Sequence, residues 1–156
     1  RRGVTGGECG GKGPGEVSEL VVAYWCAMGQ EGSAAHQDIL EDIPGAGLLA
    51  ITSADRLHAD WIATRKVRRS GQNDAVARIE TLLDRVADDA ALVTVCDAHS
   101  GTLGWLGSVA GHRIYPLGFD TFGQTGDFPD LYAEYGIDSE AILDAAARAC
   151  VRRLAV

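Results

Sequence analysis

Three short apolar runs, separated by segments of helical spacing, set the strongest limit on how this chain can fold. The runs are Leu20–Trp25, Leu48–Thr52 and Leu92–Cys96, and all three are rich in branched side chains. The second run is apolar on both faces, which is typical of a central strand in a parallel sheet covered by helices on both sides. We therefore predict an α/β domain with three buried strands.

Helices are predicted in the segments that connect these runs. Ser33 can cap the first helix, whose apolar face is formed by Ala35, Ile39, Leu40 and Ile43. Ser53 can cap a second helix over Ala54–Trp61. After a basic stretch and a Ser-Gly break, helical spacing resumes with Val76, Ile79, Leu83 and Val86.

Beyond the third run, the sequence predicts a small-residue helix, a further strand and a long final helix. The small-residue helix is expected over Thr102–Val109. The strand Arg113–Leu117 contains a proline, so we expect it at the periphery of the sheet. The final helix should start at Ser139, because Asp138 can cap it and Gly136 ends the preceding turn.

The first sixteen residues are rich in glycine and carry almost no apolar side chains. They cannot offset the entropy of being ordered by burying surface, so we predict a flexible leader over 1–16 and one α/β domain over 17–156. Residues 6–13 are one position short of a phosphate-binding P-loop, with Gly13 where the motif has Ser or Thr. Because no strand precedes this segment and no apolar helix follows it, a linker is the favoured interpretation.

Composition excludes several classes of partner. The chain has 14 basic and 22 acidic side chains and a formal charge of −8, which disfavours nucleic acid and anionic membranes. No apolar run approaches the roughly 20 residues of a membrane-spanning helix. The four cysteines form no C-x-x-C pair, and three of them lie in apolar segments, so a reducing, cytoplasmic compartment is expected.

Polar residues gather directly after the third predicted strand, where α/β proteins usually bind ligands. Asp97, His99 and Ser100 lie there, and we take His99 as the best candidate for a polar contact with a ligand or a neighbouring domain. The alternative is a purely structural role, in which these residues end the strand and cap the next helix. The other histidines, His36, His58 and His112, are too scattered for a metal site, and we expect them at the surface or supporting other groups.

The loop Phe119–Asp127 combines two aromatic residues with glycine, glutamine and threonine. We predict an interface in this loop, formed by Phe122, Gly123, Gln124, Thr125 and Gly126. Phe122 would be the apolar anchor, and the glycines would permit close backbone approach. The alternative is that Phe122 fills the core of its own domain.

Three stretches resemble the C-terminal domain of transketolase-like proteins. They are Gly47–Trp61 with T-S-A-D-R-L, His99–Gly111 with T-L-G-W-L-G-S-V, and Leu117–Asp138 with F-G-Q-T-G, D-L-Y and G-I-D. The proteins with this pattern include homodimeric pyruvate-dehydrogenase E1 enzymes and their transketolase-like bacterial relatives. The resemblance covers roughly residues 17–151.

The resemblance implies a three-layer α/β/α domain with a mainly parallel sheet of about five strands, one of them antiparallel. It also implies that the parent enzyme uses thiamine diphosphate and Mg²⁺, held by its other domains. The family's diphosphate motif begins G-D-G and ends N-N, whereas this chain has one asparagine, Asn73. No catalytic, cofactor-binding or metal-binding residue is therefore carried over to this chain.

The expected role is a scaffold and dimerisation domain that is inactive alone. Its expected partners are the thiamine-diphosphate-binding domains of the parent enzyme, a second copy of itself, or both. The parent could be a pyruvate dehydrogenase E1 or a transketolase. An alternative is a stand-alone anion- or nucleotide-binding module that uses Lys12, or Asp97 with His99. A degenerate structural protein is a third possibility.

Overall fold

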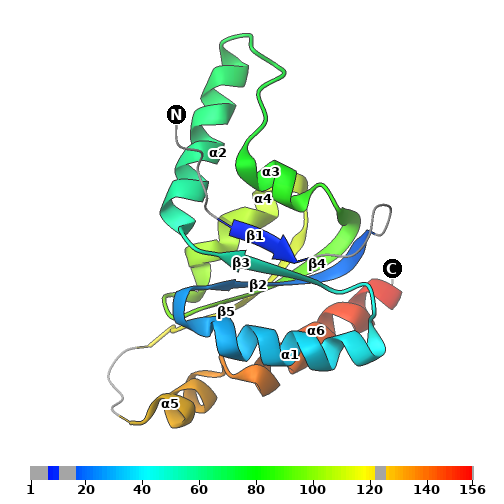
Figure 1. Cartoon of the computed structure of the whole chain (residues 1–156), viewed down its shortest axis with the longest axis vertical. Helices are drawn as coiled ribbons and strands as arrows, with labels where there is room; N and C mark the ends of the chain where they lie inside the picture. The colour runs from blue at the N-terminus through cyan, green and yellow to red at the C-terminus, as the bar shows by residue number, and fades with distance from the viewer. Residues whose placement is uncertain (1–6, 11–16, 122–125, 156) are drawn as a thin grey trace.

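Five strands form one sheet in the order β1-β3-β2-β4-β5 (Figure 1). The computed structural model describes residues 7–10, 17–121 and 126–155. The strands are β1 (Gly7–Gly10), β2 (Ser18–Trp25), β3 (Gly47–Ile51), β4 (Val86–Cys96) and β5 (Arg113–Leu117). β1 runs antiparallel to β3, and every other neighbouring pair is parallel.

Helices cover both faces of this sheet, as Figure 1 shows. One layer holds α2 (Ala54–Arg69), α3 (Arg78–Leu83), the 3₁₀ helix η2 (Ser100–Leu106) and α4 (Gly107–Ala110). The other layer holds α1 (Gly29–Asp42), α5 (Phe128–Tyr135) and α6 (Ser139–Leu154), and a short 3₁₀ turn, η1 (Cys26–Met28), leads into α1. No helix in the described part of the chain is both long and apolar enough to span a membrane. The predicted three-layer α/β/α fold is confirmed.

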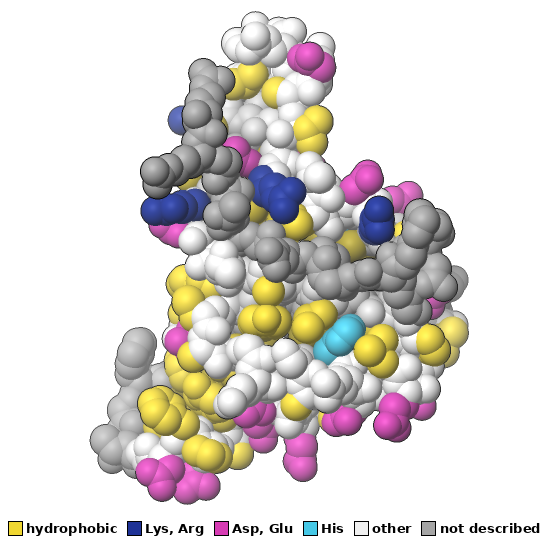
Figure 2. All heavy atoms as spheres, in the orientation of Figure 1, with side chains coloured by type: hydrophobic (Ala, Val, Ile, Leu, Met, Phe, Trp, Pro, Cys, Tyr) yellow, Lys and Arg dark blue, Asp and Glu magenta, His cyan; other side chains and the backbone are white. Residues whose placement is uncertain are grey.

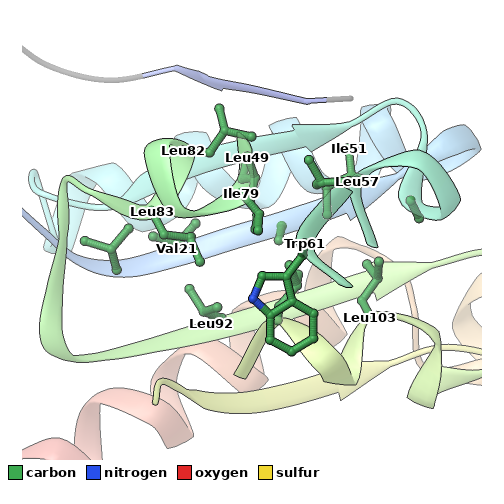
Figure 3. Close-up of a cluster of buried hydrophobic side chains, with 14 of the residues drawn as sticks. Val21, Leu49, Ile51, Leu57, Trp61, Ile79, Leu82, Leu83, Leu92 and Leu103 are labelled. Atoms are coloured by element: carbon green, nitrogen blue, oxygen red, sulfur yellow. The ribbon is translucent and has the colours of Figure 1, made fainter. Parts of the chain in front are cut away.

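Alternating residues of the central strands supply the two hydrophobic cores. In β2, Val21 and Ala23 belong to the core under α2, α3 and η2, whereas Leu20 and Val22 belong to the core under α1 and α6. Figure 3 shows the first core, in which Trp61 of α2 lies over the sheet near Leu92 and Leu103. Burial on both faces explains why the sequence showed these strands as continuous apolar runs.

The strand β1 was not predicted. The sequence predicts a flexible leader that includes Gly7–Gly10, but these residues pair with Leu48–Ile51 of β3. Strand pairing requires backbone N–H and C=O groups and no particular side chain, so a glycine-rich strand leaves no hydrophobic signal. The remainder of the predicted leader, residues 1–6 and 11–16, lies outside the described residues.

Several predicted helix boundaries were wrong. Helix α2 was expected to end at Trp61 and continues to Arg69. Helix α1 begins at Gly29 and not at Ser33, so Gly32 lies inside it. The position favours glycine because a Cβ there would be only 3.0 Å from the ring of Tyr24. The helical spacing assigned up to Val86 ends at Leu83, and Val86 instead begins β4, opposite Ser18 of β2. The pairing of Val86 with β2 therefore decides its structure, although its spacing from Leu83 fits a helix.

A bidentate ion pair holds α3 against the end of α2. The guanidinium of Arg68 donates to both carboxylate oxygens of Glu80 at 2.7 and 2.6 Å, and Glu80 also accepts from the Ala77 N–H at 2.8 Å. The hydrogen bond from Arg68 is the main cause that lowers the pKa of Glu80 below its usual value. The side chain of Glu80 therefore both starts α3 and links it to α2.

Replacing Thr94 by valine should stabilise the domain. Thr94 of β4 is 1% exposed, and its hydroxyl is one of three buried side-chain atoms that lack a hydrogen-bond partner within the described residues. An unpaired buried hydroxyl costs about 1–3 kcal/mol, so Thr94→Val should raise the free energy of unfolding in urea by about 1 kcal/mol. Thr94→Ser, which keeps the hydroxyl and loses the methyl group, should lower it. A lower urea midpoint for the valine variant than for the native chain would contradict this expectation.

Candidate functional site

The carboxyl ends of β2 and β4 form the topological switch point of the sheet. From β2 the chain crosses through α1 to β3 on one side, and from β4 it passes through η2 to β5 on the other side. Connections that leave in opposite directions open a crevice at the ends of the two strands, where α/β proteins commonly bind ligands. The residues at this edge, which we call the switch-point cluster, are Cys26, Asp97, His99, Ser100 and Asp120.

The turn after β4 and the end of β5 lie in direct contact. The Phe119 N–H donates to the Ala98 carbonyl oxygen at 2.8 Å. Gly118 lies between them with no room for a side chain, because a Cβ there would be 2.5 Å from the Ala98 oxygen and 2.6 Å from the Ser100 nitrogen. This close approach places Asp120 beside Ser100, although the two residues are far apart in sequence.

The hydrogen bonds of the cluster do not activate a nucleophile. The Ser100 hydroxyl donates to Asp120 Oδ1 at 2.5 Å, and His99 Nδ1 accepts from the Gly101 N–H at 3.0 Å. In a neutral ring this leaves the proton on His99 Nε2, which lies 3.9 Å from Asp120 Oδ1. A catalytic serine needs a base that accepts its proton, and here the serine and the histidine both face one carboxylate.

The exposure of these groups supports the same conclusion. The side chains of His99 and Asp120 are 73% and 67% exposed, so solvent screens any attraction between them. His99 also accepts the N–H that begins η2, so its observed role is to cap that helix. The structure thus favours a structural role for His99 and Ser100, at the end of the strand and the start of the next helix, over a catalytic one.

Two thiols lie at this edge and neither is activated. Cys26 is exposed and has a left-handed backbone with φ of 54°, which is uncommon for a residue other than glycine. Although the residue is exposed, partial desolvation of its thiol, and secondly the nearby Asp97 carboxylate, raise the pKa of that thiol. Burial likewise raises the pKa of Cys96, whose Sγ lies 3.6 Å from the Ala98 oxygen. Catalytic cysteines have lowered pKa values, so the raised pKa values give neither thiol the activation of a catalytic nucleophile.

The histidines outside the cluster take three different structural positions. His36 Nε2 lies 3.0 Å from the Ala46 oxygen, and the His58 ring lies against both Trp61 and Trp105 at 5.9 and 4.8 Å. His112 is 5% exposed, so of its two predicted positions, at the surface or supporting other groups, the surface one does not apply. Within the described ranges, no group of three or more His, Cys, Asp or Glu residues is placed to hold a metal ion.

Most of the predicted interface loop lies outside the described residues. This applies to Phe122, Gly123, Gln124 and Thr125, whereas Gly126 is described and is exposed. Helix α5 follows directly and buries none of its residues. Figure 2 shows hydrophobic side chains gathered over this part of the molecule, at the lower left.

The aromatic side chains of α5 fall into an exposed and an anchored group. Phe128 is 73% exposed, and its ring lies 6.1 Å from that of Tyr132. Tyr135 meets Phe119 edge-to-face at 4.7 Å, next to the core under α1 and α6. The helix is therefore fixed at its carboxyl end, and Phe128 is presented to solvent at its amino end.

The phosphate-loop interpretation of the leader gains no support from the described residues. Gly7–Gly10 are extended and paired in a strand, whereas a phosphate loop curves around its ligand and then enters a helix. The next described element after this segment is β2, which is also a strand. Gly6 and the stretch that contains Lys12 lie outside the described residues.

Comparisons with known proteins identify the fold. No protein-family model matches the chain, and no curated protein does. Transketolase from Leishmania mexicana superposes with a TM-score of 0.63 at 17% identity, over 94% of this chain and 18% of that one. The chain has the fold of a transketolase C-terminal domain. Transketolase from Pichia stipitis, in complex with sedoheptulose 7-phosphate, matches with a TM-score of 0.60 at 16% identity, over 96% of this chain and 18% of that one.

A third structure is a shorter protein. A split-gene transketolase, described as an inactive β4 tetramer, matches with a TM-score of 0.58 at 16% identity, over 86% of this chain and 39% of that one. The chain thus spans about 18% of the length of the two undivided transketolases. At these identities the comparisons establish the transketolase C-terminal-like fold, and the sequence resemblance agrees with them.

Two residues of the switch-point cluster were missed in the sequence. Asp120 was treated only as part of a loop, and Cys26 only as an apolar cysteine. Gly118, which brings the two loops together, was also overlooked. Their roles depend on the register of β4 against β5, where Val95 lies opposite Leu117. A glycine directly after a predicted strand was the one local signal, because it often marks close backbone approach.

Proposed function

We propose that this chain is the C-terminal scaffold domain of a thiamine-diphosphate-dependent enzyme and has no catalytic activity alone. One observation carries the proposal: nearly the whole chain matches less than a fifth of each undivided transketolase. The absence of an activated serine or thiol in the switch-point cluster supports a role outside the chemistry. The enzyme is either a transketolase or a pyruvate dehydrogenase E1, and we place it in the cytoplasm.

The described residues do not fit thiamine diphosphate and Mg²⁺. Mg²⁺ prefers an octahedral set of oxygen ligands, and the described carboxylates form no group that could provide several of them. The switch-point cluster carries Asp97 and Asp120, which would repel a diphosphate. We infer that the cofactor is held by the other domains of the enzyme, and that this chain contributes binding surface to the assembly.

The amino end of α5 is the surface we assign to this assembly. Phe128 is a large apolar side chain, 73% exposed, directly after the predicted interface loop of residues 119–127. Buried aromatic anchors contribute most of the binding energy in protein interfaces. The split-gene transketolase, described as inactive, is a precedent for a partial chain that exists as a separate polypeptide. A second copy of the chain is the alternative partner for the same surface.

A reconstitution experiment tests the proposal. The chain is mixed with the thiamine-diphosphate-binding domains of the transketolase-like enzyme of the same genome, and ketol transfer and 2-oxo acid oxidation are both assayed. We expect no activity and no calorimetric binding of thiamine diphosphate with Mg²⁺ by the chain alone. We expect activity after mixing. Micromolar cofactor binding by the isolated chain would refute the proposal.

A pair of matched variants tests the docking surface. Phe128→Ser should raise the concentration of chain needed for half-maximal reconstitution by about tenfold or more, as truncation of an interface anchor does. Val76→Ser removes another apolar side chain, 65% exposed, between α2 and α3 in the opposite layer, and should change nothing. Equal effects of the two substitutions would contradict the assignment of α5.

A further inference from the structure

We propose that a hollow beside the last turn of α6 binds a small oxyanion, the charged head of a phosphate or carboxylate compound, between Arg113 and Arg152. The hollow has a volume of about 500 Å³ and lies at the opposite end of the strands from the switch-point cluster. Its polar lining consists of Asp88, Asp89, Arg113, Tyr115, Arg152 and Arg153. The inference does not depend on the proposed function.

The hollow exists because β4 is longer than β5. The first pair between these strands is Ala91 with Arg113, whereas β4 already begins at Val86. The five residues of β4 before Ala91 therefore extend past the start of β5. Gly111, with a left-handed φ of 83°, turns the chain into β5 at this point. Helix α6 covers the same side of the sheet, so the step between the strands becomes a surface hollow.

One arginine of the lining is already fully engaged. Arg153 donates to Asp89 Oδ2 and Oδ1 at 2.7 and 3.1 Å, and to Glu19 Oε2 at 2.7 Å. The bond from Arg153 is the main cause that lowers the pKa of Asp89. This network ties the end of α6 to β2 and β4. It also fixes one wall of the hollow, and we assign it no direct role in binding.

The other two arginines have no hydrogen-bond or ion-pair partner among the described residues. Arg152 in the last turn of α6 complements the helix dipole, which explains a basic residue there without a ligand. That explanation does not extend to Arg113, which lies on β5 and faces the same hollow. Two uncompensated guanidinium groups from separate elements match the bidentate way in which arginine binds phosphate and carboxylate.

Asp88 restricts where the anion can lie. It is a carboxylate on the β4 side of the hollow with no ion-pair partner in the described ranges, and it repels an anion that approaches it. The head group is therefore held on the α6 and β5 side, near Tyr115, whose hydroxyl can donate a hydrogen bond. The formal charge of −8 makes long-range attraction of anions weak, so recognition depends on these short-range contacts.

Calorimetric titration of the full chain tests the site. Sodium pyrophosphate and sodium citrate are the probes, each compared with sodium chloride at equal ionic strength. We expect saturable binding of at least one, and the tighter of the two identifies phosphate or carboxylate as the preferred head. Absence of saturable binding of both at about 10 mM, where even millimolar affinity would be detected, would overturn the proposal.

Three variants locate the anion. Combined Arg113→Gln and Arg152→Gln should weaken binding by about tenfold or more, since the charge-assisted hydrogen bonds of both guanidinium groups are lost. Arg148→Gln removes an exposed arginine of the same helix that pairs with Asp144, and should leave the affinity unchanged. Asp88→Asn should strengthen binding, and this result can be measured even if the double variant does not fold. An equal loss with Arg148→Gln, or weaker binding by Asp88→Asn, would contradict the site.

Discussion

Trp61→Ala is expected to lower the free energy of unfolding by about 3–5 kcal/mol, as truncation of a large core aromatic does. Trp61 is 5% exposed and packs in the core under α2, α3 and η2 (Figure 3). Its ring also contacts Trp105 at 5.5 Å and His58 at 5.9 Å. Alanine at this position would leave a cavity in the core between α2 and the sheet. Urea denaturation monitored by far-UV circular dichroism measures the change.

The cation above the Trp61 ring provides the control. The Arg65 guanidinium lies 4.8 Å from the ring centroid, and its side chain is exposed. A cation–π contact at an exposed site contributes about 0.5–1 kcal/mol, so Arg65→Gln should cost no more than that. If both variants lost similar stability, the indole would not be the packing residue that the structure indicates.

The sequence was informative about the strands and helices that bury side chains. The runs at 20–25, 48–52 and 92–96 all became strands, because residues buried on both faces of a parallel sheet must be apolar. The capping residue Asp138 was also recognised, and it accepts the Ala141 N–H at 2.9 Å. These signals are local, so one sequence is enough to show them.

Features that depend on backbone contacts between distant segments could not be predicted. Strand β1 consists of residues whose pairing leaves no pattern, and the Ser100–Asp120 hydrogen bond requires the register of two strands. The burial of His112 next to α3 is of the same kind. The resemblance to transketolases supplied the antiparallel strand in general terms, but did not place it at Gly7–Gly10.

Gly118→Ala is expected to have the second large effect. The added Cβ would lie 2.5 Å from the Ala98 oxygen, 2.6 Å from the Ser100 nitrogen and 2.7 Å from the Ser100 Cα, all of them backbone atoms. A side chain could rotate away, but these atoms can yield only if the turn after β4 separates from the end of β5. We expect a loss of about 1–3 kcal/mol of stability, the usual cost of overpacking a close contact.

The position of the damage distinguishes this mechanism from a general effect of alanine. Gly104 lies in the neighbouring helix η2, where an added methyl group would meet no heavy atom within 4 Å, so Gly104→Ala should be neutral or stabilising by up to about 0.5–1 kcal/mol. Hydrogen exchange of the Phe119 N–H, which bonds to Ala98, should accelerate in Gly118→Ala and stay unchanged in Gly104→Ala. Because Phe119 begins the proposed interface loop, Gly118→Ala should also weaken reconstitution. Native stability together with unchanged exchange at Phe119 would show that the two loops are not held together at Gly118.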